Sequence, residues 1–384
     1  MALVLTRSST VLFDTGSTDL ILPKEGCTTC SNHTLFDPSK STSFSSRPGS
    51  NISLNFGTGG KAVPLDEPEP VSGIIVADVV KINGASVANQ TFLLCDSYPD
   101  ALNDQPIDGI FGMGPPGASS FASMVNSTLS NWFWSLAAAG GVPEAVFSFY
   151  LNSGSASPGG ELTLGGTDSS KYEGDVEKVN FNATITQMIG EWFIDMPTFF
   201  VDGKSVSNSD SGESFPAGVA LLDTGTAFIQ TPDFQTAKDI YAVISPEIKQ
   251  IDKKGTWGAS CDVMEALSPS LTFTIGSGNK TINMTVPTTS FNLGAYPGKS
   301  GMCQGVILNA AEPVSDLASV WVLGSPLIKG YYTVWDGKNL ELGVAKLKGT
   351  GTSGGDGTSP TATNGAGSLL PSLAGIAAVA LLIL

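Results

Sequence analysis

The chain has 384 residues, with 35 acidic and 19 basic side chains, one histidine and a net charge of −16 at neutral pH. This acidic balance argues against nucleic acid or an anionic membrane surface as a partner. It suits work in acid, where many carboxylates become neutral, although a soluble extracellular surface would have the same composition. The length leaves room for two lobes with a sizeable core.

Most of the chain is predicted to be β-structure. Short β-branched and aromatic runs alternate with clusters of Gly, Pro, Ser and Asn, which is typical of strands joined by turns. Helices are predicted at 127–139 and at 231–244. The second helix is expected to begin with Thr231 as N-cap and Pro232 in its first turn.

The tripeptide Asp-Thr-Gly occurs twice, once in each half of the chain. The first copy is Asp14-Thr15-Gly16 and the second is Asp223-Thr224-Gly225. Each copy follows an apolar run and precedes a hydroxyl residue, Ser17 or Thr226. Two ordinary β-turns would use the same residue types, but the matching context of both copies favours a paired site.

Two such loops can form a site of paired carboxylates. Each apolar strand would deliver its Asp to a buried turn, and Gly would let the opposite loop approach closely. The Thr hydroxyls could bond across to the other loop, and Ser17 and Thr226 could bond the carboxylates. Because two adjacent carboxyls cannot both ionise, they would serve as a general acid and a general base around one water. Such a site needs no metal or other cofactor.

A longer repeat surrounds the two tripeptides. An apolar-apolar-Gly strand ending lies downstream of each Asp, at Ile110-Phe111-Gly112 and at Val322-Leu323-Gly324. The closing glycines stand 98 residues after Asp14 and 101 residues after Asp223. Near-equal spacing predicts a duplicated lobe, with one Asp from each lobe facing a cleft between them.

With these motifs the chain resembles the pepsin-like aspartic proteases from Val11 to about Lys348. The resemblance rests on Phe-Asp-Thr-Gly-Ser-Thr, Phe56-Gly57-Thr58-Gly59, Asp108-Gly-Ile-Phe-Gly112, Leu222-Asp-Thr-Gly-Thr226 and Val322-Leu-Gly324. It implies a bilobal double-β-barrel fold in which Asp14 and Asp223 are the catalytic pair. Thr15 and Thr224 would lock the two loops together.

The resemblance also implies a flap and two disulfides. Phe56, Gly57, Thr58 and Gly59 would form the hairpin that closes over substrate. Cys261 and Cys303 stand where the family has its second-lobe disulfide, and Cys27 and Cys30 follow the first motif as its first-lobe disulfide does. Cys27 and Cys30 could instead be redox-active or half of a zinc site. Cys95 is then a buried free thiol, and the lone His33 is expected at the surface.

Two departures from the family bear on the flap. Phe56 replaces the usual flap tyrosine, and Ile21 replaces the tryptophan that this tyrosine bonds, so both polar partners are missing together. We expect a looser flap and slower turnover. Residues 61–70, rich in Pro and acids, are predicted as an inserted exposed loop that either restricts substrates or is neutral.

The end of the chain predicts a surface anchor. We expect lobes at 1–175 and 176–348, a Gly/Ser/Thr-rich stalk at 349–368 and an apolar tail at 369–384. Small residues, a polar spacer and a terminal apolar run match a GPI signal, with a tail-anchored helix as the alternative. Attachment is expected among Ser353, Gly354, Gly355 and Gly357.

The start of the chain lacks parts that a secreted member of the family has. Residues 1–10 are too short and polar for a signal peptide, and the family's outer strand and its Gly-Thr-Pro turn are absent. We therefore expect either a truncated gene model, with a downstream Met taken as the start, or a real isoform that cannot fold or be secreted normally. Seven Asn-x-Ser/Thr sequons and the cysteines still suggest the secretory pathway and the cell surface.

Two functions follow from these patterns. The first is an acid-active, monomeric aspartic endopeptidase that cleaves polypeptides between bulky apolar residues. The second is a catalytically impaired cell-surface binding or structural protein of the same fold. Sensitivity of activity to Asp14→Asn favours the first, and binding that survives replacement of both Asp residues favours the second.

Overall fold

The structure is a computed structural model of the whole chain. It describes residues 8–55, 70–117, 119, 121, 131–151, 160–206, 218–310, 320–349 and 379–383. The predicted flap, Phe56 to Gly59, and nearly all of the predicted insertion at 61–70 lie outside these residues. So does most of the predicted stalk and tail.

The first lobe is built on a seven-stranded sheet. Its strand order is β25-β1-β6-β2-β5-β4-β3, and β25 also pairs with β4, which closes six of the strands into a barrel. The tight turn between β4 and β5 uses Asn83 and Gly84, both with positive φ, as two-residue hairpins prefer. The strands are β1 (Ser8–Asp14), β2 (Leu20–Pro23), β3 (Ser45–Asn55), β4 (Pro70–Ile82), β5 (Ala85–Ser97), β6 (Gly109–Gly112) and β25 (Val379–Ile383).

The second lobe repeats the central arrangement of the first. Its sheet has the order β10-β13-β22-β14-β21, so that β13 matches β1, β22 matches β6 and β14 matches β2. In both lobes the first of these pairs is parallel and the next is antiparallel. These strands are β10 (Phe193–Asp195), β13 (Val219–Leu222), β14 (Ile229–Thr231), β21 (Ile307–Asn309) and β22 (Trp321–Leu323).

Two smaller sheets complete the second lobe. One has the order β12-β11-β17-β18 and the other β15-β16-β20-β19. Their strands are β11 (Thr198–Val201), β12 (Lys204–Val206), β15 (Lys249–Gln250), β16 (Trp257–Ser260), β17 (Leu271–Ser277), β18 (Lys280–Thr285), β19 (Asn292–Ala295) and β20 (Met302–Gly305).

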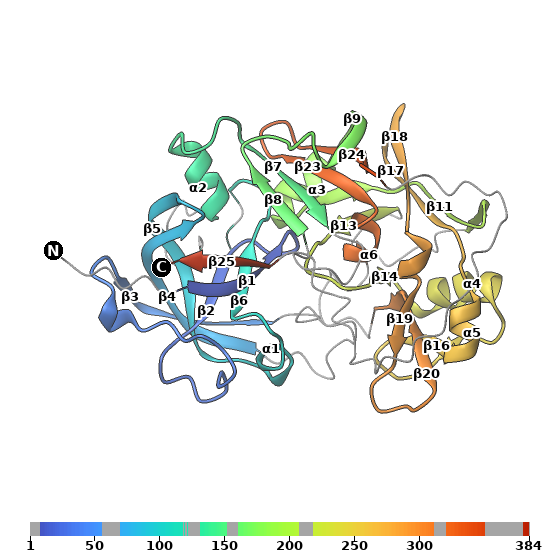
Figure 1. Ribbon diagram of the computed structural model, residues 1–384, viewed down its shortest axis with the longest axis horizontal. Helices are drawn as coiled ribbons and strands as arrows, with labels where there is room; N and C mark the ends of the chain where they lie inside the picture. Colours follow the sequence, from blue (N-terminus) through green and yellow to red (C-terminus); the bar gives the residue numbers. More distant parts are fainter. Residues whose placement is uncertain are drawn as a thin grey trace.

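A five-stranded sheet is shared by the two halves of the chain. Its order is β8-β7-β23-β24-β9, with β7 (Val146–Leu151), β8 (Gly160–Leu164), β9 (Tyr172–Asn180), β23 (Tyr331–Asp336) and β24 (Glu341–Leu347). Figure 1 shows these strands between the blue-to-cyan first lobe and the yellow-to-orange second lobe. The predicted boundary at 175/176 falls inside β9. The predicted mostly-β, bilobal fold is confirmed.

Helices are short and few among the described residues. They are α1 (Asp100–Asn103), α2 (Trp132–Ala138), α3 (Ala183–Ile189), α4 (Phe234–Ile244), α5 (Cys261–Ala266) and α6 (Ser325–Ile328). The predicted start of α4 is wrong: Asp233, not Thr231, is its N-cap and accepts a hydrogen bond from the Thr236 amide at 2.8 Å. Thr231 instead ends β14, because the strand extends to the residue before Pro232.

Aromatic side chains dominate the core beneath the shared sheet. The rings of Phe147 and Trp335 stack 5.9 Å apart, and the ring of Trp192 lies 5.5 Å from that of Trp335. Phe147 precedes the predicted lobe boundary at 175/176, whereas Trp192 and Trp335 follow it. All three side chains are fully buried, so the two halves share one apolar core and large aromatic areas stabilise their contact.

The cysteines pair as the family resemblance implies. The structure contains the disulfides Cys27–Cys30 and Cys261–Cys303. Cys95 is a buried free thiol, as predicted. Burial raises the pKa of this thiol well above its usual value, which keeps it protonated and unreactive.

The described end of the predicted tail lies in the first lobe. Val379–Ile383 (β25) pairs antiparallel with β1, with Ser8 opposite Ile383 and Leu12 opposite Val379 (Figure 1). The apolar composition of residues 369–384 predicts a tail outside both lobes, whereas here Val379–Ile383 satisfies backbone groups at the edge of β1. Within the described parts of the chain, no helix has the length and apolarity needed to cross a membrane.

Candidate active site

Equivalent strands carry Asp14 and Asp223 to the ends of their sheets. Asp14 closes β1 and stands beside Gly112 of β6, and the Met113 amide donates to the Asp14 carbonyl at 2.7 Å. Asp223 directly follows β13, and its amide donates to the carbonyl of Leu323 in β22 at 3.1 Å. The apolar-apolar-Gly repeat seen in the sequence is therefore the neighbouring strand that fixes each Asp.

The two Asp loops are joined by reciprocal hydrogen bonds. The Thr15 amide donates to Thr224 Oγ1 at 3.1 Å, and the Thr224 amide donates to Thr15 Oγ1 at 3.0 Å. Each hydroxyl donates in turn to a carbonyl of the opposite strand, Thr15 to Leu222 at 3.0 Å and Thr224 to Phe13 at 2.8 Å. Both threonines are fully buried. These four bonds hold the two loops in one geometry.

Each carboxylate is oriented by its own loop. Asp14 accepts from the Gly16 amide at 2.9 Å and from the Ser17 hydroxyl at 2.6 Å. Asp223 accepts in the same way from the Gly225 amide at 2.7 Å and from the Thr226 hydroxyl at 2.5 Å. The side chains predicted to support the carboxylates therefore contact them.

Glycine is required where the loops pass each other. A Cβ atom on Gly16 would lie 2.5 Å from Cγ of Asp223, and one on Gly225 would collide with the Asp14 carboxylate. Real side chains do not approach so closely. The two glycines thus bring each loop against the carboxyl group of the other lobe.

The surroundings of Asp14 favour its protonated form, and Asp14 and Asp223 are hereafter called the dyad. Burial raises the pKa of Asp14 well above its usual value, and the Asp223 carboxylate raises it further by charge and by a side-chain hydrogen bond. The hydrogen bonds from Ser17 and Gly16 act in the opposite direction because they favour the ionised form. The balance of these effects favours a proton on Asp14.

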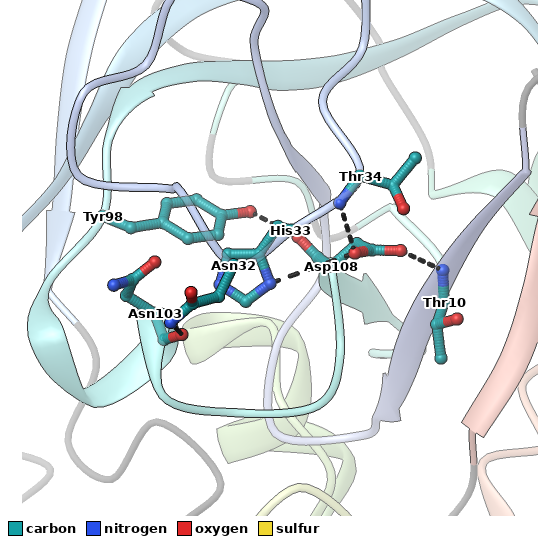
Figure 2. Close-up of polar contacts among 7 residues, drawn as sticks. All are labelled: Thr10, Asn32, His33, Thr34, Tyr98, Asn103 and Asp108. Carbon is teal, nitrogen blue, oxygen red and sulfur yellow. Dashed lines mark hydrogen bonds and ion pairs between the residues drawn. The ribbon is translucent and has the colours of Figure 1, made fainter.

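Asp108 supports the strand that carries Asp14. Figure 2 shows its carboxylate between two chain segments, where it accepts from the Thr10 amide at 2.6 Å and from the Thr34 amide at 2.7 Å. The Tyr98 hydroxyl donates to the Asp108 carbonyl at 3.0 Å. Thr10 lies in β1, so this buried cluster fixes β1 four residues before the dyad.

The prediction that His33 lies at the surface is wrong. Its side chain is 1% exposed, and Nδ1 lies 3.9 Å from Oδ1 of Asp108 (Figure 2). Its ring packs edge-on against Tyr98, 5.6 Å between centroids. Burial lowers the pKa of His33, although the Asp108 charge opposes this. The residues around His33 are polar, which predicts exposure. The ring is enclosed because its loop folds back against Asp108, the residue before β6.

The remaining predicted residues do not meet at the dyad in the described structure. Ile21 is buried in an apolar cluster with Leu93 and Ile110, and Phe56 lies outside the described residues. A hollow of about 990 Å³ lies between α2 and β5 and touches none of the dyad loops.

One residue near the dyad was not singled out by the sequence. Glu191 is half-buried, and its Oε2 has no hydrogen-bond partner in the described part of the structure. Burial and the Asp223 charge raise its pKa to about 8. The sequence offers one sign of this position: Glu191 is an acidic residue directly before the apolar run that starts at Trp192.

Comparison with known proteins agrees with this geometry. The family described as eukaryotic aspartyl protease matches residues 6–347. The chain is 30% identical to pepsin A of Canis lupus familiaris, over 88% of this chain and 77% of that protein. It is 29% identical to gastricsin of Callithrix jacchus, over 87% and 77% of the two chains. It is 28% identical to an aspartic protease of Phaffia rhodozyma, over 88% and 74%.

The fold and the site define a class of two-lobed β-proteins in which each lobe contributes one Asp-Thr-Gly loop to a shared pair of carboxyls. The family match covers most of the chain and includes both loops. The chain belongs to the eukaryotic aspartyl protease family.

Proposed function

We propose that this protein is an aspartic endopeptidase that hydrolyses peptide bonds of polypeptides at acid pH, with Asp14 and Asp223 as the catalytic pair. The observation that carries the proposal is the reciprocal bonding of Thr15 and Thr224, which holds the two carboxyls together. The raised pKa of Asp14 supports a dyad with one proton. Membership of the family supports the peptidase class.

The chemistry follows from one proton shared by two carboxyls. The ionised carboxyl takes a proton from a water whose oxygen bonds to the peptide carbonyl carbon, while the protonated carboxyl gives its proton to the carbonyl oxygen. The resulting gem-diol then breaks its C–N bond. The leaving nitrogen takes the proton that the first carboxyl accepted from water, and the second carboxyl takes a proton back from one hydroxyl of the gem-diol, so the dyad returns to its starting state. Ser17 and Thr226 keep the carboxylates oriented throughout.

The site of action is proposed to be outside the cell. Two disulfides support passage through an oxidising compartment. Exposed sequon residues at Asn32, Asn51, Asn89, Asn279 and Asn283 are compatible with glycosylation there. A GPI anchor attached within 353–357 would remove the tail that includes β25, so the two arrangements exclude each other in one molecule.

The experiment is an assay of the protein purified from the cells that express it. We expect cleavage of a denatured protein somewhere between about pH 2.5 and 7, inhibition by pepstatin and a loss of at least about 100-fold in Asp223→Asn. The intact mass of the same material shows whether the tail is present or replaced by an anchor. A folded protein without cleavage at any pH would contradict the proposal and favour the impaired, binding form of the fold.

A further inference from the structure

Glu191 lies just before β10, and Asp223 lies just after the neighbouring strand β13. In β10 and β13, Phe193 pairs with Leu221 and Ile194 with Ala220. The pairing continues one step beyond, because the Leu222 amide donates to the Trp192 carbonyl at 3.1 Å. Glu191 then lies in a bend, where the Phe193 amide donates to its carbonyl at 3.0 Å, so Glu191 and Asp223 are each one residue from the bond between Trp192 and Leu222. The Asp223 charge acts on the Glu191 carboxyl, which agrees with this proximity.

The backbone on both sides of Glu191 is fixed. Helix α3 ends before Gly190, which adopts the left-handed conformation with φ 87°. On the other side, Trp192 Nε1 donates to the Met113 carbonyl at 2.9 Å. The Met113 amide in turn donates to the Asp14 carbonyl. Trp192, the residue after Glu191, therefore links the second lobe to the Asp14 strand of the first lobe through Met113. The chain on both sides of Glu191 is therefore held in place next to the dyad loops.

The carboxyl of Glu191 has no cationic partner in the described structure. Asp223 is the charged group that acts on it, and no Lys or Arg among the described residues forms an ion pair with it. Lys338 lines a nearby hollow with Gly190 but does not pair with Glu191. An enclosed carboxyl oxygen without a hydrogen bond is costly. Rotation about the last side-chain bond can turn this oxygen towards a ligand.

We propose that Glu191 is a specificity-determining residue that binds a Lys or Arg side chain of the polypeptide next to the scissile bond. This rests on the proposed peptidase function. A cationic side chain would satisfy the unpartnered oxygen, whereas an apolar one would leave it buried and unpaired and an acidic one would be repelled by Asp223. The expected preference for bulky apolar residues would then not apply to the position that meets Glu191.

The preference has a defined pH dependence. A bound ammonium or guanidinium favours the ionised carboxylate and lowers the pKa of Glu191 from its raised value. Cation binding is therefore coupled to proton release, and the preference for Lys over an uncharged side chain grows as the pH rises through the acid range. At low pH, Glu191 stays neutral in both complexes and the preference disappears.

The test measures the binding of uncleavable peptides to the full-length protein. Each peptide carries a hydroxyethylene group in place of the scissile amide, and Lys or norleucine at one of the three positions on either side of it. At one position we expect Lys to bind roughly tenfold tighter than norleucine at about pH 6, falling towards equality near pH 4. Glu191→Gln, which keeps the shape and removes the charge, should abolish this ratio.

Glu177→Gln is the matched control, because Glu177 is exposed on β9 and its loss changes the net charge equally. It should leave the ratio unchanged. Equal Lys preferences in the parent and Glu191→Gln at every position would overturn the inference. If Glu191→Gln does not fold, the parent alone decides. A ratio of Lys-peptide to norleucine-peptide affinity that does not rise with pH would then overturn the inference. Hydrolysis of the amide peptides is measured separately: absence of cleavage with the binding ratio intact counts against the peptidase function alone.

Discussion

Gly16 and Gly225 show how one missing atom sets the geometry of the dyad. Each glycine lies against the carboxyl of the opposite lobe, so its Cα–H face is the contact surface between the loops. The nearby hydroxyls of Ser17 and Thr226 then complete the hydrogen bonds of each carboxylate. At this scale, the proposed catalysis depends on carboxyl groups that are held in place to within fractions of an ångström.

Gly16→Ala is predicted to reduce activity strongly while leaving the fold intact. A Cβ 2.5 Å from Cγ of Asp223 must push that carboxyl aside, and a displacement of about 1 Å costs roughly 100-fold in kcat. The check is kcat alongside a circular dichroism spectrum. Gly166→Ala is the control, because nothing lies within 4 Å of its added Cβ. Equal activity of the two variants would contradict the close approach.

The residues that sequence identified and those it missed differ in kind. Asp14, Asp223 and their hydroxyl neighbours form a local motif whose spacing repeats, so the pattern alone indicated a paired site. Glu191 acquires its position only through the pairing of β10 with β13, and His33 is buried only because its loop folds back onto Asp108. No local pattern encodes contacts that depend on strand register or on a returning loop.

At the scale of elements, the duplicated strands could be foreseen and the closing strand could not. The repeat of Ile110-Phe111-Gly112 and Val322-Leu323-Gly324 corresponds to β6 and β22 beside their Asp strands. The partner of β1 on its other edge is β25, more than 360 residues later in the chain. An apolar run at that distance carries no local signal of pairing, because the same composition suits a membrane anchor.

The two disulfides are predicted to contribute unequally to stability. Cys261–Cys303 closes a loop with a sequence separation of 42, whereas Cys27–Cys30 has a separation of 3. On chain-entropy grounds, replacing the first pair by alanines should cost roughly 4 kcal/mol of unfolding free energy, and replacing the second about 1.5 kcal/mol. Denaturant unfolding of the two double variants measures both losses. Equal losses would show that native packing, not loop closure, sets their contributions.

For the whole molecule, the buried carboxyls should make the free energy of unfolding larger at acid pH than at neutral pH. Raised pKa values of Asp14 and Glu191 mean that the folded state holds protons that the unfolded chain releases. Their contributions are fully present below the ordinary carboxyl pKa and are lost as the pH rises. The lowered pKa of His33 acts in the other direction, because its contribution is present above pH 6.5 and is lost as the pH falls.

Glu191→Gln isolates one of these contributions. The pKa of Glu191 is raised from 4.5 to about 8, so the parent should lose unfolding free energy relative to the variant as the pH rises across that window. The relative loss is on the order of a few kcal/mol. Thermal unfolding of both proteins at several pH values measures it, and parallel curves would contradict a buried, neutral Glu191.

The reciprocal contacts of Thr15 and Thr224 have a consequence for the direction in which a polypeptide lies. What one loop donates the other returns, so the two loops are related by a local two-fold axis. A site with that symmetry cannot distinguish the amino end of a bound chain from its carboxyl end. The distinction must come from side chains that break the symmetry. Glu191 lies near Asp223 in one lobe only, so it gives the two ends of the site different chemistry. It would therefore favour one orientation of the bound polypeptide over the other.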